Sequence, residues 1–180
     1  MKKDYPSKWL KQGEQSKITK TIKDIAKQFS GTELEKIKGI LNYLDNNIRA
    51  CRDNNKVIKI FATRTATEVL KDGFSTGCHD TALLFVTFCR AVGIPAKYVV
   101  GINKFRPRDR GHVVAEIYLA GVWVLVDPSP GYISLYPERS AFYAENFLIG
   151  KGYDSWDVGI NSFKTWVRKS DRIIGILSKI

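Results

Sequence analysis

One cysteine and one histidine in this chain are placed where they could act as a nucleophile and its base. Cys78 directly follows Gly77 at the start of a predicted helix, where unpaired backbone N–H groups and the helix dipole favour the reactive thiolate. A cysteine nucleophile needs a base within hydrogen-bond reach, and the chain has only two histidines. His79 is the next residue on the same helix and points about 100° away, which leaves His112 as the candidate base.

The remaining cysteines indicate structural roles. A lone cysteine is often a buried core residue, and Cys89, deep in the same apolar helix, fits that role better than Cys78 does. Cys51 lies in a polar stretch and is expected to be exposed. An odd number of cysteines without a CxxC pair argues against a disulfide framework and against a structural zinc site. We therefore expect no metal and no organic cofactor.

The strand that begins at His112 should pair with a second strand that ends beside Asp127. Residues 112–119 and 122–126 have the composition of strands, and Gly121 suits a tight hairpin turn between them. In that register Asp127 is a diagonal neighbour of His112 on the same face, with the two backbones roughly 7 Å apart. A hydrogen bond between the carboxylate and the imidazole is therefore expected.

The opposite face of this hairpin is wholly apolar and must pack on a core. It consists of Val113, Ala115, Ile117, Leu119, Val122, Val124 and Val126. A slip of one residue would bury His112 and Asp127 among valines, so the apolar pattern fixes the register. Taken singly, His112 also fits an exposed strand end and Asp127 a turn residue before a proline. Glu116 shares the polar face and competes for the acid role, and Ser129 or His79 could line the pocket.

The helices that would position these residues follow from the spacing of apolar side chains. Residues 18–29 form one amphipathic helix, and a second begins at Thr32, which forms a capping box with Glu35. A short helix is predicted over residues 65–71. The helix over residues 78–92 is apolar nearly all round, which is typical of a helix buried in the middle of a fold.

A helix followed by antiparallel strands predicts an α+β fold. The strands are expected over residues 97–105, 112–119 and 122–126, and a terminal helix over residues 163–180. A length of 180 residues suits one domain. We expect residues 1–180 to form it, with a helical N-terminal part (1–55), a core (60–130) and a C-terminal extension (131–180).

Composition excludes several classes of protein. The chain is 44% hydrophobic and 26% charged, as in ordinary globular proteins, and has no apolar run near the roughly 18 residues of a membrane span. The first residues have lysines but no apolar segment behind them, which favours the cytoplasm over secretion. The net charge of +11 indicates a lysine-rich solvated surface or an anionic partner. Because the charges are dispersed, we expect no specific nucleic-acid partner.

A basic loop leads directly into the candidate base. Arg106, Arg108 and Arg110 alternate with other residues just before His112, so they should border its cleft. They could bind an acidic or phosphorylated substrate. They could equally form a solvated loop around Pro107, and the sequence leaves both interpretations open.

Three motifs in this order resemble the transglutaminase-like superfamily. They are Gly77-Cys78 followed by Arg90-Ala91-Val92-Gly93-Ile94-Pro95-Ala96, then His112 with Glu116, then Trp123 with Asp127-Pro128. The resemblance covers about residues 60–130. It implies a papain-like core in which the nucleophile helix packs on an antiparallel sheet. It also assigns the nucleophile to Cys78, the base to His112 and the acid to Asp127.

Such a triad implies acyl transfer through a thioester, with a peptide or protein as substrate. Water as the acyl acceptor gives a protease or amidase, and an amine gives a transglutaminase; the resemblance favours hydrolysis. An amidase like peptide N-glycanase is an alternative, although the zinc-binding cysteines of that family are missing here. A non-catalytic binding module that retains the fold is a different class. The sequence does not indicate an oligomeric state.

Overall fold

The computed structural model describes residues 5–106 and 111–177 of the chain. Five strands form one antiparallel sheet, and two short strands pair in parallel beside it. In chain order the strands are β1 (Arg49–Ala50), β2 (Phe74–Ser75), β3 (Ala96–Asn103), β4 (Gly111–Leu119), β5 (Val122–Asp127), β6 (Tyr132–Ser134) and β7 (Asn146–Gly152). The large sheet has the order β6-β5-β4-β3-β7, and β1 pairs with β2.

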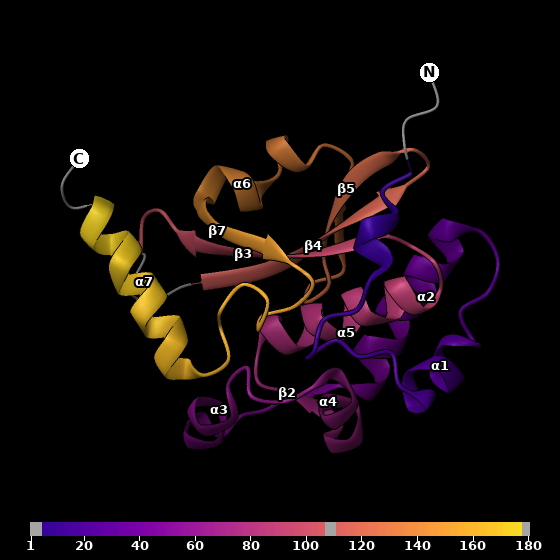
Figure 1. The fold of residues 1–180 in the computed structure, drawn as a ribbon, viewed down its shortest axis with the longest axis horizontal. Coiled ribbons are helices and arrows are strands. Elements are labelled where there is room, and N and C mark those ends of the chain that lie inside the picture. The colour runs from indigo at the N-terminus through magenta and orange to yellow at the C-terminus, as the bar shows by residue number, and fades with distance from the viewer. Residues whose placement is uncertain (1–4, 107–110, 178–180) are drawn as a thin grey trace.

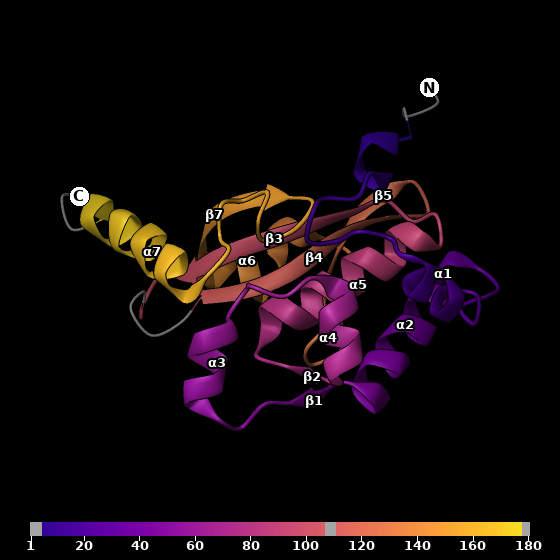
Figure 2. The same ribbon diagram turned by 60° about the horizontal axis from the view of Figure 1, so that its bottom comes forward.

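Most helices cover one face of this sheet. They are α1 (Lys20–Ala26), α2 (Glu33–Asn47), α3 (Asn54–Ile60), α4 (Ala66–Asp72), α5 (Cys78–Ala91), α6 (Ala141–Glu145) and α7 (Phe163–Leu177), with 3₁₀ turns η1 (Ser7–Leu10) and η2 (Pro137–Arg139). Figures 1 and 2 show α1, α2, α4 and α5 together on one side of the sheet. This arrangement confirms the predicted α+β class. Within the described ranges, no helix is long and apolar enough to cross a membrane.

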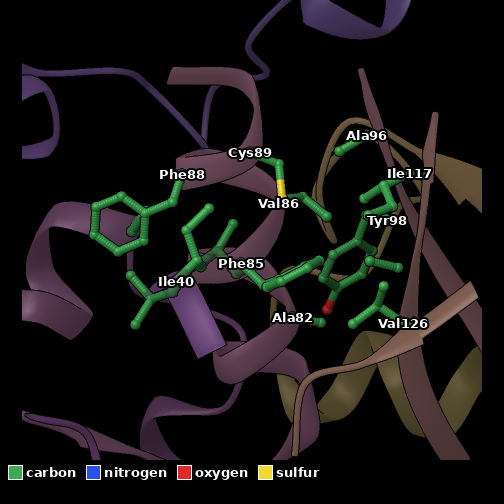
Figure 3. Close-up of a cluster of buried hydrophobic side chains, with 14 of the residues drawn as sticks. Ile40, Ala82, Phe85, Val86, Phe88, Cys89, Ala96, Tyr98, Ile117 and Val126 are labelled. Carbon is green, nitrogen blue, oxygen red and sulfur yellow. The ribbon is translucent and has the colours of Figure 1, made fainter. Parts of the chain in front are cut away.

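Helix α5 is the centre of the core, as its apolar sequence predicts. It packs against β3 and β4 on one side and against α1, α2 and α4 on the other. Phe88 is turned toward Ile40 of α2, whereas Phe85 is turned toward Tyr98 of β3 (Figure 3). Burial of an aromatic side chain of this size contributes roughly 1.5–3 kcal/mol. Cys78 is the first residue of this central helix.

The β4–β5 hairpin has the predicted register. Ala115 pairs with Val126, and Leu119 pairs with Val122. The turn residues Ala120 and Gly121 both have positive φ, as the two-residue hairpin turn with matching twist requires. The predicted apolar face lies in the core, with the exception of Val122, which is 46% exposed beside the turn.

Each N-terminal helix begins at a capping side chain, and the cap of α2 is the predicted one. Helix α1 begins two residues later than predicted, because Thr19 caps it by accepting from Ile22 N, and it ends at Ala26. Helix α2 starts with the predicted capping box of Thr32 and Glu35. Helix α3 starts at the cap Asp53 and has no buried residue.

The last 50 residues complete the sheet and its outer face. Strand β7 pairs with β3 and forms one edge of the sheet. Helix α6 lies on the face opposite α5, where Phe142 packs with Val99, Val114 and Leu125. Asp154 then ties this region to the N-terminal segment, because its Oδ2 accepts from the backbone N–H groups of Gln15 and Ser16 at 3.1 and 3.0 Å.

Candidate active site

Cys78 lies at the first turn of α5, as predicted. Its neighbour Gly77 caps the helix with φ +142° and ψ −170°, a conformation that side chains strongly disfavour. The chain therefore turns sharply into the helix at a glycine and presents Cys78 half-buried at the surface. Backbone N–H groups of a first turn have no partner within the helix, so they can stabilise negative charge beside Cys78.

His112 and Asp127 meet on the sheet, and the predicted hydrogen bond between them is confirmed. Nε2 of His112 lies 2.5 Å from Oδ2 of Asp127. The other carboxylate oxygen accepts from the backbone N–H of Ser129 at 3.2 Å. Both carboxylate oxygens are thus engaged, which fixes the plane of the Asp127 side chain and, through it, the ring of His112.

His112 also faces Cys78, although the two residues come from different layers. Burial disfavours a charged imidazole here, but the hydrogen bond with Asp127 and the proximity of the Cys78 side chain outweigh it and raise the pKa of His112 to about 10. Because Nε2 is engaged by Asp127, Nδ1 is the ring atom available to Cys78. A cationic imidazole beside a cysteine is the arrangement that supports a thiolate nucleophile.

A groove of about 660 Å³ runs past Cys78. Its lining combines apolar and polar side chains. The apolar side chains include Leu41, Leu44, Ile48 and Ile133, and the polar ones include Lys38, Asn42, Asp45 and Ser129. Helix α2 forms one wall, and the turn after β5 forms the other. A second hollow of about 420 Å³ contains His112 and Asp127 together with Phe142 and Tyr132. Cys78 thus lines the first hollow, whereas His112 and Asp127 line the second.

Glu116, the other candidate for the acid role, binds different partners. Glu116 is 3% exposed and accepts from Tyr143, Lys151 and Lys97 at 2.5, 2.6 and 3.0 Å. Its oxygens are therefore bound by these three groups, and it is Asp127 that binds His112.

Of the two residues that could line the pocket, one does and one does not. His79 is buried against Phe61, with ring centroids 4.1 Å apart, and is absent from the groove lining. Ser129 does line the groove, as one of the alternatives expected.

The basic loop is described only in part. Arg106 is exposed, and its backbone N–H donates to Asn103 Oδ1 at 2.9 Å. Arg108 and Arg110 lie outside the described residues. Of the other cysteines, Cys89 is fully buried, and burial raises the pKa of its thiol. Cys51 is half-buried rather than exposed, because its backbone N–H donates to Ser75 O at 2.8 Å beside the β1–β2 pair.

Sequence reasoning missed a group of buried polar residues next to Cys78. Asp80 is completely buried, and Arg64 and Thr76 both donate to it. The signal in the sequence was a charged residue two positions after the candidate nucleophile, inside an otherwise apolar helix. A buried carboxylate at such a position requires partners.

Comparison with solved structures shows the same fold in bacterial proteins. A proposed cysteine protease from Cytophaga hutchinsonii superposes with a TM-score of 0.65 at 20% sequence identity; the match covers 85% of this chain but 48% of that protein. Legionella pneumophila LapG superposes with a TM-score of 0.54 at 14% identity, with coverage of 84% and 95%. At such identities the likeness shows the fold alone.

Sequence comparison identifies the family of this chain. No curated protein matches the chain at a significant level. The sequence model of the transglutaminase-like superfamily matches residues 21–128, more than half of the chain. The matched range contains Cys78, His112 and Asp127.

Proposed function

This chain belongs to the transglutaminase-like superfamily, and from that membership we propose that it is an acyl-transfer enzyme that hydrolyses peptide or amide bonds. Cys78 is the nucleophile, His112 the base and Asp127 the acid that orients it. The observation that carries the proposal is the His112–Asp127 hydrogen bond of 2.5 Å, formed where His112 also faces Cys78. The Cytophaga hutchinsonii neighbour, a proposed cysteine protease, is in line with it.

In the first half-reaction, the Cys78 thiolate attacks the carbonyl carbon of the substrate. The carbon–sulfur bond forms, and the negative charge moves to the carbonyl oxygen, beside the backbone N–H of Cys78. When this intermediate collapses, the carbon–nitrogen bond breaks and the amine takes the proton from Nδ1 of His112. Asp127 holds Nε2 throughout and stabilises the imidazolium without taking its proton, by the logic of a catalytic triad.

In the second half-reaction, water replaces the amine. Nδ1 of His112 accepts a proton from water as the oxygen attacks the thioester carbon. Collapse of this intermediate breaks the carbon–sulfur bond, releases the carboxylic acid and restores the Cys78 thiolate beside the protonated His112. An amine in place of water would give a new amide, so the identity of the acceptor separates a hydrolase from a transglutaminase.

The groove at Cys78 suits a peptide substrate. Its apolar side chains can contact the side chains of a peptide, and its polar ones can hydrogen-bond the peptide backbone. We propose that the acyl side of the substrate lies between α2 and the turn after β5. A volume of about 660 Å³ accommodates a short peptide segment.

The test is selective alkylation. Iodoacetamide labelling at pH 6.5, mapped by mass spectrometry, should modify Cys78 much faster than Cys51, because a protonated His112 beside Cys78 favours the thiolate, which is the form that is alkylated. The His112→Ala variant should lose this selectivity. Equal, slow labelling of both cysteines in the native protein would contradict the proposal.

The reaction catalysed is tested separately. A fluorogenic peptide library, incubated with and without a primary amine, should release carboxylic acid products in both cases. Amide products that form only when the amine is present would show transfer in place of hydrolysis.

A further inference from the structure

A chain of buried hydrogen bonds lies directly behind the nucleophile, and we propose that Thr76, with His79, Asp80 and Arg64, is the device that positions Cys78. These are positioning residues, because they act on the backbone that flanks Cys78. The inference rests on the proposed role of Cys78 and adds what holds that residue against His112.

The Asp80 side chain binds the backbone segment that precedes Cys78. Its Oδ2 accepts from the backbone N–H of Thr76 at 2.8 Å and from the Thr76 hydroxyl at 2.7 Å. Thr76 comes two residues before Cys78, and Asp80 comes two residues after it. The carboxylate therefore closes a ring of backbone around Gly77 and Cys78. This ring holds Gly77 in its positive-φ turn and fixes the direction of the Cys78 N–H.

The hydrogen-bond pattern determines which ring nitrogen of His79 carries the proton. The Thr76 hydroxyl donates its single proton to Asp80, which as a carboxylate can only accept. The His79 Nε2 atom, 2.9 Å from the same hydroxyl oxygen, must therefore be the donor. Burial also lowers the pKa of His79, so the ring is neutral with its proton on Nε2. His79 serves as a donor that braces Thr76, not as a second base.

Arg64 anchors this ring to the rest of the helical layer. Its side chain is 8% exposed and bridges two carboxylates, Asp80 through Nη2 at 2.5 Å and Asp72 through Nη1 at 2.7 Å. The guanidinium also lies 4.5 Å from the ring centre of Phe74, in the strand that leads to Thr76. An ammonium group could not reproduce this fork of contacts.

Such an anchor matters because the two halves of the site belong to different layers. His112 and Asp127 are held by the register of the sheet, whereas Cys78 follows a loop and a glycine turn. A displacement of about 1 Å at a reacting group costs on the order of 100-fold in rate. The buried ring around Cys78 limits that displacement.

The test compares three substitutions of buried threonines. Thr76→Val removes the hydroxyl but keeps the shape, and should lower the iodoacetamide labelling rate of Cys78 at pH 6.5 by about 10-fold or more. Thr76→Ser retains the hydroxyl and should restore the native rate. Thr87→Val is the matched control, because it removes another buried hydroxyl of α5, bonded to Leu83 O at 2.6 Å and far along the helix from Cys78. It should leave the labelling rate unchanged.

Labelling of the fully buried Cys89 reports unfolding in every variant. Slow labelling of Cys78 with no labelling of Cys89 supports a positioning role. Native labelling of Cys78 in Thr76→Val overturns it. If Thr76→Val does not fold, the same comparison of Cys78 and Cys89 labelling is made on Arg64→Lys. Slow labelling of Cys78 alone supports the positioning role, and native labelling overturns it.

The His112→Ala variant separates this inference from the proposed function. If His112→Ala labels Cys78 at the native rate, the proposed function fails, and this inference fails with it. If His112→Ala slows labelling but Thr76→Val does not, the positioning role alone is overturned.

Discussion

Replacing Asp127 by asparagine removes the charge that holds His112 while nearly keeping the side-chain shape. The bond concerned is the 2.5 Å contact between Oδ2 and Nε2, and hydrogen bonds to charged groups contribute about 1.5–3 kcal/mol. Because the His112 side chain is 35% exposed, solvent screening favours the lower part of that range, about 1.5–2 kcal/mol. Since about 1.4 kcal/mol is a factor of ten, labelling of Cys78 at pH 6.5 should fall about 10- to 30-fold.

The effect should also depend on pH in a definite direction. Burial lowers the pKa of His112, but the Asp127 and Cys78 side chains outweigh it and raise this pKa to about 10. Without the charge of Asp127, this pKa should return toward its ordinary value of about 6.5. The imidazolium of the variant is then lost at lower pH than that of the native protein. The difference in labelling should be largest at neutral pH and should shrink above about pH 10, where His112 is neutral in both proteins.

The assay is the labelling rate of Cys78 from pH 5.5 to 10.5, with Cys51 as the internal reference. Asp45→Asn is the matched control, because it removes a carboxylate from the groove rim while His112 keeps its own acid partner. Native labelling in Asp127→Asn at pH 6.5 would refute the reasoning. A loss that is constant from pH 6.5 to 10.5 would refute its electrostatic part.

Three further outcomes are expected. Because the pKa of His112 is raised on folding, its contribution to stability is complete below about pH 6.5 and is lost as the pH rises to about 10. The Tm of the native protein should therefore fall more across this pH window than the Tm of His112→Gln. Equal falls in the two proteins would contradict this. Glu116→Gln breaks a buried ion cluster and should cost about 3 kcal/mol in urea unfolding, with Cys78 labelling unchanged; a loss of labelling would make Glu116 the acid. Replacing Arg106, Arg108 and Arg110 by alanine should leave turnover of peptide substrates unchanged, whereas a large rise in KM for an acidic peptide would show substrate recognition.

The sheet half of the site was predictable because it depends on local patterns. Strand side chains alternate, and the two-residue turn at Gly121 sets which residues face each other. Together these patterns put His112 and Asp127 on one face before any tertiary contact is considered. The same applies to the start of α5, where Gly77 precedes an apolar helix.

Other elements have no comparable local pattern. Helix α3 buries no side chain, so no apolar periodicity marks it. Strand β7 is irregular: its register with β3 shifts at Gly101, and most of its residues are only half-buried. Its place at the edge of the sheet depends on pairing with β3, more than 40 residues earlier in the chain. The spacing of apolar residues within one segment does not determine such a pairing.

The contrast between the two halves indicates where the site can be disturbed. Pairing of His112 with Asp127 is maintained by the whole β4–β5 ladder, so substitution of any one residue around it leaves most of the register intact. Cys78 instead depends on a few buried polar contacts, and the fully buried Asp80 has one oxygen, Oδ1, that no described donor satisfies. Buried networks of this kind lose much of their value when one partner is removed. Substitutions at Thr76 or Arg64 should therefore disturb the nucleophile more than equally conservative changes within the hairpin core.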